Sequence, residues 1–181
     1  MADQPRLFDD DPASPAPAQT SDAQHEWRGR LEAVHAEARS LAAHLPQELH
    51  FGTSSWSFPG WAGIVYAARR TESELAREGL REYATHPLLT TVGIDRSYYA
   101  PIPLDDFRRY ADQLPDGFRC CIKAPSTFTS YALGATGAPV LNQEFLSHWR
   151  LIDDLLEPCE IAFKSHTGPI VIECPPVPRG V

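Results

Sequence analysis

Short apolar runs that end abruptly in polar residues recur along this sequence. The clearest run spans residues 88–94, Leu-Leu-Thr-Thr-Val-Gly-Ile, and Asp95-Arg96-Ser97-Tyr98-Tyr99 follows at once. Val92 and Ile94 share one face of an extended strand because side chains alternate, and this leaves Asp95 on the opposite face. We therefore predict a buried strand whose C-terminal end carries reactive and hydrogen-bonding side chains.

Three further runs have the same form and predict three further strands. They span residues 50–54, 118–123 and 169–176. The second ends on Lys123, and Glu173 lies in the polar end of the third. Segments with helical periodicity separate the strands, at residues 71–86, at 104–114 and after Asn142. Residues 71–74, Thr-Glu-Ser-Glu, predict a capping box at the start of the first helix, and Asn142 is expected to cap the last one. Strands that alternate with helices and have continuous apolar runs predict parallel βαβ units, that is, an α/β fold.

The N-terminal part of the chain has a different pattern. Residues 1–20 contain four prolines among Asp, Ala and Gln and are predicted to be disordered. Residues 21–46 place Trp27, Leu31 and Val34 at helical spacing, which predicts an amphipathic helix against the outside of the main domain. Residues 47–181 then form the (β/α) domain.

Composition narrows the class of protein. A chain of 181 residues with 43% hydrophobic content can build one sizeable core, and its net charge of -8 argues against direct nucleic-acid binding. No signal sequence and no apolar run long enough to span a membrane is found. The four cysteines, Cys120, Cys121, Cys159 and Cys174, do not have the spacing of metal ligands. They predict a reduced, cytoplasmic protein in which the thiols are buried.

Metal and cofactor signatures are absent from the sequence. The seven histidines show no H-x-H, H-x-x-x-H or H-E-x-x-H spacing, so no metal site is predicted. No G-x-G-x-x-G follows the first predicted strand and no G-x-S-x-G occurs, so neither a dinucleotide cofactor nor a catalytic serine is expected.

Four motifs occur in a characteristic order: F-G-T-S-S-W-S-F-P-G-W at residues 51–61, T-V-G-I-D-R-S-Y-Y-A-P-I-P at 91–103, F-R-C-C-I-K-A-P at 118–125 and C-P-P at 174–176. Together they resemble the motifs of the YecE-like family, domain of unknown function 72, from about Leu49 to the C-terminus. The resemblance implies a TIM-barrel-like fold and specifies no reaction.

The sequence departs from the family pattern in two respects. Gly93 stands at a position where relatives often carry Glu, so no carboxylate can be assigned there. A complete (β/α)8 barrel needs roughly 200–250 residues, whereas four predicted strands make up about half of one. We expect either a truncated fragment, inactive in the extreme case, or a half-barrel that self-associates through its exposed strand edges.

The strand ends define the candidate catalytic site. In a barrel, Asp95, Lys123 and Glu173 converge at the C-terminal ends of the strands, where barrel enzymes do their chemistry. Asp95 is expected to take a proton while a desolvated Lys123 stabilises the developing anion, and Arg96 with Tyr99 is expected to hold a phosphate or carboxylate. The alternative is a structural salt bridge between charges that must pair.

An aromatic loop follows the first predicted strand. Trp56 and Trp61 lie in it, together with Phe58 and a Pro-Gly turn. One interpretation is a stacking wall that binds a sugar or base, and the alternative is a small core that closes one end of the fold. The leading functional hypothesis is therefore a hydrolase- or isomerase-like barrel enzyme for a small polar or phosphorylated, sugar- or nucleotide-like molecule.

A second hypothesis concerns the N-terminal tail. Gln4, Leu7 and Phe8 resemble the Q-x-x-L-F type of peptide that docks on the DNA-polymerase sliding clamp, with two apolar plugs and a glutamine that fixes their register. An incidental apolar pair in an unstructured tail is the alternative. A clamp-docking tail would make the chain an adaptor in DNA replication or repair, and this is compatible with a catalytic domain.

The adaptor hypothesis predicts that a peptide of residues 1–11 binds a bacterial sliding clamp with a Kd tighter than about 1 mM, a free energy of about -4 kcal/mol. Because the two apolar side chains supply the affinity, the Leu7→Ala/Phe8→Ala peptide should not bind. Titration of both peptides by fluorescence anisotropy tests this. Equal binding of the two peptides, or no binding of either, contradicts the hypothesis.

Overall fold

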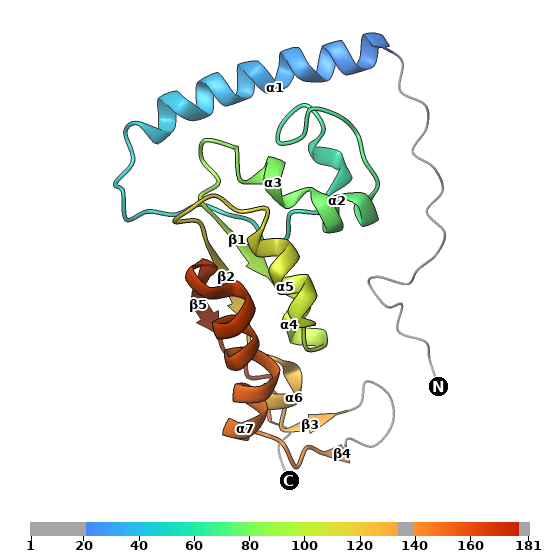
Figure 1. Ribbon diagram of the computed structural model, residues 1–181, viewed down its shortest axis with the longest axis vertical. Coiled ribbons are helices and arrows are strands. Elements are labelled where there is room, and N and C mark those ends of the chain that lie inside the picture. Colours follow the sequence, from blue (N-terminus) through green and yellow to red (C-terminus); the bar gives the residue numbers. More distant parts are fainter. Residues whose placement is uncertain (1–20, 134–139, 178–181) are drawn as a thin grey trace. The chain divides into compact units, whose positions relative to one another are not determined.

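The computed structural model describes residues 21–133 and 140–177. These residues form two compact units (Figure 1). The first, here called the sheet unit, comprises residues 93–112, 119–133 and 140–177. The second, the helical unit, comprises residues 21–92 and 113–118, so the boundary between them falls within strand β1 (Thr91–Ile94).

A three-stranded sheet forms the core of the sheet unit. Its order is β1-β2-β5, with β2 at Arg119–Lys123 and β5 at Thr167–Val171. Strands β2 and β5 run parallel, and an irregularity in register falls between Cys120 and Ile122. The predicted α/β class with a parallel sheet is confirmed, although the last strand begins two residues earlier than predicted.

Alternation along the strands explains which side chains form this core. Val92 and Ile94 of β1 are buried, and so are Cys120 and Ile122 of β2, while the residues between them are more exposed. Burial raises the pKa of the Cys120 thiol well above its ordinary value, so this cysteine is an apolar core residue. The two-faced pattern predicted for these strands is confirmed.

Helices and a small hairpin complete the sheet unit. Their bounds are α4 Arg96–Tyr99, α5 Leu104–Ala111, α6 Ser126–Thr129, β3 Ala132–Leu133, β4 Val140–Leu141 and α7 His148–Leu151. The π-helical turns η2 (Ile152–Leu156) and η3 (Cys159–Phe163) and the 3-10 turn η4 (Lys164–His166) then lead into β5. Phe107 of α5 packs on Phe163 of η3, with ring centroids 5.3 Å apart.

The segment after Asn142 differs from its prediction. The sequence predicts one helix there, but α7 begins only at His148 and continues as π-helical turns. The side-chain oxygen of Asn142 accepts from the Glu144 amide at 3.0 Å, but in a turn and not at the start of a helix. Its side-chain nitrogen donates to the carbonyls of Thr127 and Ser130, 2.6 and 2.8 Å away. These contacts join segments distant in sequence and were not readable from local periodicity.

The helical unit contains α1 Ser21–Ala42, η1 Pro59–Trp61, α2 Glu72–Glu78 and α3 Leu80–Tyr83. α1 is the long helix at the N-terminal end of the described chain (Figure 1). The capping box predicted at Thr71 is confirmed, because Thr71 and Glu74 bond reciprocally at the start of α2. The predicted continuous helix over residues 71–86 is divided at Gly79, which ends α2.

The predicted first strand at residues 50–54 is wrong. Only an isolated parallel bridge joins Phe51 to Leu89, with the amides of Thr90 and Thr91 donating to the Phe51 carbonyl. The amide of Thr53, two residues further along the chain, donates instead to the hydroxyl of Tyr83 at 3.0 Å. A side-chain partner thus replaces the ladder bond that a strand would need at this position.

The exposure of the cysteines and of the end of β5 bears on two further predictions. All four cysteines are free thiols, and Cys120 and Cys159 are buried, but the prediction of buried thiols is wrong for Cys174, which is exposed. Val171 and Ile172, at and just beyond the end of β5, are also exposed. Self-association through this edge stays a prediction. No helix among residues 21–133 and 140–177 is long and apolar enough to cross a membrane.

A histidine pair in the helical unit predicts acid sensitivity. The rings of His35, on α1, and His86 contact each other edge to face at 4.8 Å. The pKa of His35 is lowered by burial and then by Arg39, with a smaller opposing effect of Glu82, and the pKa of His86 is lowered by burial and then by His35. As the pH falls below the ordinary value of 6.5, the unfolded chain takes up protons that the folded pair resists, so the free energy of unfolding should fall.

The measurement is the Tm at about pH 7.5 and about pH 5, where a difference of roughly 2–4 °C corresponds to about 1 kcal/mol. His35→Leu/His86→Gln should lose much of the acid-induced decrease, because neither replacement titrates. The matched control is His44→Gln, since the exposed His44 ring bonds only locally to the Ser40 carbonyl. An unchanged acid decrease in the double variant would contradict the assignment.

Candidate functional site

A lysine lies between two carboxylates at the C-terminal edge of the sheet. The Nζ of Lys123, the last residue of β2, is 2.8 Å from Oε2 of Glu173 and 4.0 Å from Oδ2 of Asp95. Asp95 directly follows β1 and Glu173 lies two residues beyond β5. The carboxyl ends of parallel strands meet at one edge, so the structure brings together all three residues predicted as catalytic.

One buried hydroxyl joins two of these strand ends. Oγ of Ser97 lies 2.7 Å from the carbonyl of Ile94 and 2.6 Å from the carbonyl of Lys123. Ser97 is only 2% exposed, so its hydrogen bonds have little competition from water. The turn that starts α4 is thereby held against the end of β2, and this keeps Asp95 beside Lys123.

The charge state of Lys123 follows from its partners. The pKa of this lysine is raised chiefly by its hydrogen bond to Glu173, against a smaller effect of burial, with Asp95 adding to the rise. It therefore remains an ammonium at neutral pH and can stabilise an anion but cannot act as a base. Its side chain is 24% exposed, so the desolvation predicted for this lysine is partial.

Two tyrosines line the same edge. The Lys123 ammonium lies 5.2 Å from the centroid of the Tyr98 ring, a cation–π distance. Tyr98 contacts Tyr99 edge to face at 5.4 Å, and Tyr99 is 72% exposed. Sequence reasoning singled out Tyr99 and missed Tyr98 and Ser97, although all three lie in the same motif and only the tertiary contacts distinguish their roles.

Arg96 has its recorded partners outside the lysine cluster, the name used here for Asp95, Lys123 and Glu173. Its guanidinium donates to Asp106 of α5 at 2.7 Å and to the Tyr110 hydroxyl at 2.8 Å, and Asp106 also pairs with Arg109. Arg96 therefore ties α4 to α5. The anion-binding role assigned to Arg96 from sequence stays a prediction.

The aromatic loop belongs to the helical unit. Trp56 is buried and its indole N–H donates to the Leu75 carbonyl at 3.0 Å, which favours the packing interpretation for this residue. Trp61 is half-buried and its ring lies 5.5 Å from that of Phe58. Substrate binding by either tryptophan stays a prediction, and Gln4, Leu7 and Phe8 lie outside the described residues.

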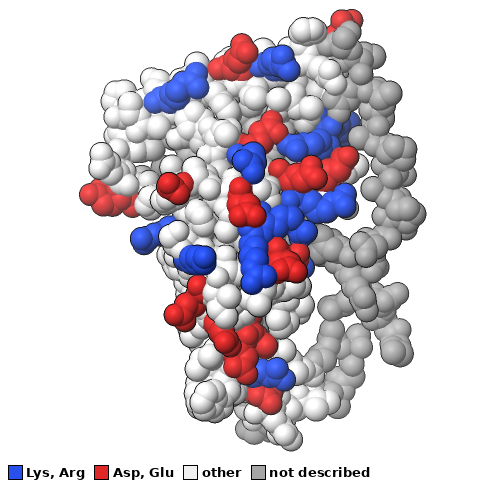
Figure 2. All heavy atoms as spheres, viewed as in Figure 1, with Lys and Arg blue, Asp and Glu red and all other residues white. Residues whose placement is uncertain are grey.

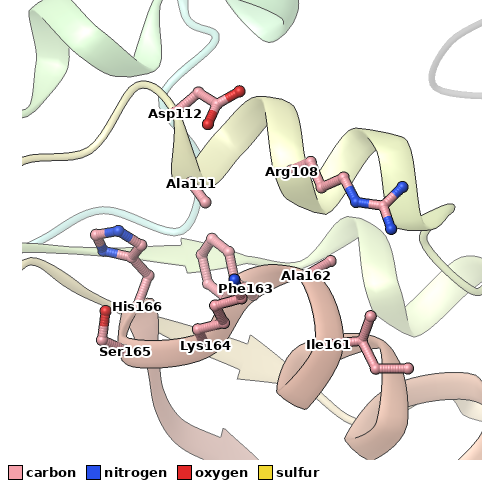
Figure 3. A pocket seen from close by; sticks show the side chains of 9 residues that line it. All are labelled: Arg108, Ala111, Asp112, Ile161, Ala162, Phe163, Lys164, Ser165 and His166. Atoms are coloured by element: carbon pink, nitrogen blue, oxygen red, sulfur yellow. The ribbon is translucent and has the colours of Figure 1, made fainter.

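A cavity lies elsewhere in the sheet unit, apart from the lysine cluster. A cavity of about 360 Å³ is lined by the end of α5 and by residues 161–166 (Figure 3). The Arg108 guanidinium points away from Lys164 and His166, so these three basic groups do not converge (Figure 3). The lining residues 161–166 come just before β5 in the chain, at its N-terminal end. The lysine cluster lies at the C-terminal ends of the strands.

Lysine is rare in this chain. Only two of its sixteen basic residues are lysines, Lys123 and Lys164, and the other fourteen are arginines. A lysine places a compact charge where an arginine would place a broad planar fork.

On the face shown in Figure 2, basic and acidic side chains are interleaved. Within the described ranges, no group of three or more His, Cys, Asp or Glu residues is placed to hold a metal ion.

Removal of the Ser97 hydroxyl should weaken the site from within. In Ser97→Ala, the carbonyls of Ile94 and Lys123 lose the one hydroxyl proton that they share, and we expect a loss of about 1–2 kcal/mol in the free energy of unfolding, seen as a decrease in denaturation midpoint. Ser73→Ala, at an exposed position of α2, is the control and should change the midpoint little. Equal midpoints for Ser97→Ala and the wild type would show that this hydroxyl does not hold the strand ends.

No curated protein and no solved structure matches the chain. The family described as "Protein of unknown function DUF72" matches residues 50–178, which include the lysine cluster and more than half of the chain. The chain therefore belongs to the DUF72 family.

Proposed function

We propose that the lysine cluster is the active site of an enzyme that carries out acid–base chemistry on a small polar molecule. The observation that supports this most is that Asp95, Lys123 and Glu173 meet at the ends of β1, β2 and β5, which are neighbours in the sheet. The proposal includes a barrel-like arrangement of the (β/α) units, in which strand C-termini form the reacting edge.

Each residue of the cluster has a separate role in this proposal. Asp95 lies 4.0 Å from Lys123, beyond hydrogen-bond distance, so it can accept a proton from a bound molecule. Lys123 stabilises the negative charge that develops as the proton leaves. Glu173 makes the 2.8 Å hydrogen bond that orients the ammonium and is a positioning residue.

A purely structural ion pair is the competing explanation, and the exposure of the partners argues against it. The side chains of Asp95 and Glu173 are 46% and 54% exposed. Ion pairs this open to water contribute about 0–1 kcal/mol to stability. Charges at a strand end with little structural benefit are better explained by contact with a molecule from solution.

The proposal predicts that substitutions in the lysine cluster lower the turnover number and leave the Tm nearly unchanged. Asp95→Asn and Lys123→Met should each reduce turnover of a responsive compound by a factor of 100 or more, on the order of general acid–base contributions. The Tm of the two variants should remain within a few degrees of the wild type. A panel of sugars, sugar phosphates and nucleosides, with product detection by mass spectrometry, supplies the assay.

Lys164→Met is the matched control, because it removes the other lysine of the chain from an exposed position remote in sequence from the cluster. It should retain wild-type turnover. Full turnover in Asp95→Asn and Lys123→Met would refute the catalytic assignment, and so would the absence of any turnover in the wild type across the panel.

A further inference from the structure

We infer that the lysine cluster is built for an uncharged, polyhydroxylated ligand such as a sugar ring, and that it discriminates against the phosphorylated form of the same ring. This inference rests on the proposed function, because it names the substrate class of the same site. It is supported by the local charge balance, by the engagement of the nearby arginine and by the exposed aromatic ring.

The charge balance of the cluster is the first observation. One ammonium, that of Lys123, is shared between the carboxylates of Asp95 and Glu173. These three groups therefore carry one negative charge in excess at neutral pH. A phosphate that approached Lys123 would meet two carboxylates around a cation that is already neutralised, which is an unfavourable electrostatic arrangement.

The neighbouring arginine does not reverse this balance at the site. Arg96 follows Asp95 in sequence, but its guanidinium is directed to Asp106 and Tyr110. A phosphate would therefore compete for Arg96 with contacts at 2.7 and 2.8 Å that hold the guanidinium at α5. The arginine is thus part of the scaffold that joins α4 to α5.

An organic cation is disfavoured for a related reason. The position between the two carboxylates and over the Tyr98 ring is the place where such a cation would bind, and the Lys123 ammonium already occupies it. A second cation would have to displace the lysine from this position. The arrangement therefore disfavours an added anion by charge and an added cation by occupancy.

Hydroxyl groups suit the same atoms. Carboxylate oxygens accept hydrogen bonds from hydroxyls, and both carboxylates here are about half exposed. The ammonium can donate to a ring or hydroxyl oxygen. The Tyr99 ring is 72% exposed beside Tyr98 and offers an apolar face to the C–H face of a sugar.

The two lysines allow a direct test. Protein labelled with ¹³Cε-lysine contains only Lys123 and Lys164, so each ligand can be followed at the site and at an internal reference. D-ribose, D-glucose and myo-inositol are titrated against ribose 5-phosphate and inorganic phosphate. We expect at least one neutral ligand to shift the Lys123 signal saturably, with the Lys164 signal unchanged, and ribose 5-phosphate to bind about tenfold more weakly than ribose.

Two variants check the physical cause. Asp95→Asn removes the excess negative charge, so the preference for ribose over ribose 5-phosphate should shrink toward equality. Tyr99→Ala removes the exposed ring and should weaken the neutral ligands without altering the preference between the two riboses.

Tighter binding of ribose 5-phosphate or inorganic phosphate at Lys123 would overturn the inference while leaving a ligand site there, as the proposed function requires. A Lys123 signal that no neutral ligand shifts would also overturn the inference. In both cases the proposed function is judged separately, by the turnover of Asp95→Asn and Lys123→Met.

Discussion

The site depends on one buried hydroxyl that is shared by two strand ends. Ser97 reaches the last carbonyl of β1 and the last carbonyl of β2, so the turn that follows β1 is held against its neighbouring strand. Asp95 and Tyr98 lie on either side of Ser97 in sequence and are placed by the same contact. The ionic interactions of Lys123 are more exposed and weaker, and they act on a backbone that this hydroxyl already positions.

This arrangement separates the scaffold from the reacting groups. Core residues such as Val92, Ile94 and Ile122 alternate with the polar residues along the strands, so one face builds the fold while the other supplies the site. The ammonium of Lys123 is held by acceptors on two sides, which preorganises its charge for a developing anion.

Prediction from sequence succeeded where local pattern and local chemistry agree. Strand alternation at residues 91–94 and 119–123 and the capping box at Thr71 depend on near neighbours, and all three are present. It failed where a distant partner claims a backbone or side-chain group. Tyr83 takes the amide of Thr53, where a strand would need a ladder partner. Asn142 is bonded to Thr127 and Ser130 in a turn, and α7 begins only later in the chain.

The sequence by itself determined the α/β class, the family and the identity of the charged residues at the strand ends, because these follow from periodicity and from ordered motifs. Only the tertiary structure decided what those residues do to one another. It separated Lys123, which faces two carboxylates, from Arg96, which is bonded into α5, and it showed Ser97 as the link between strands. The reason is physical: the partner of a side chain is set by which strand lies next to it, and strand adjacency is a long-range property that no local stretch of sequence encodes.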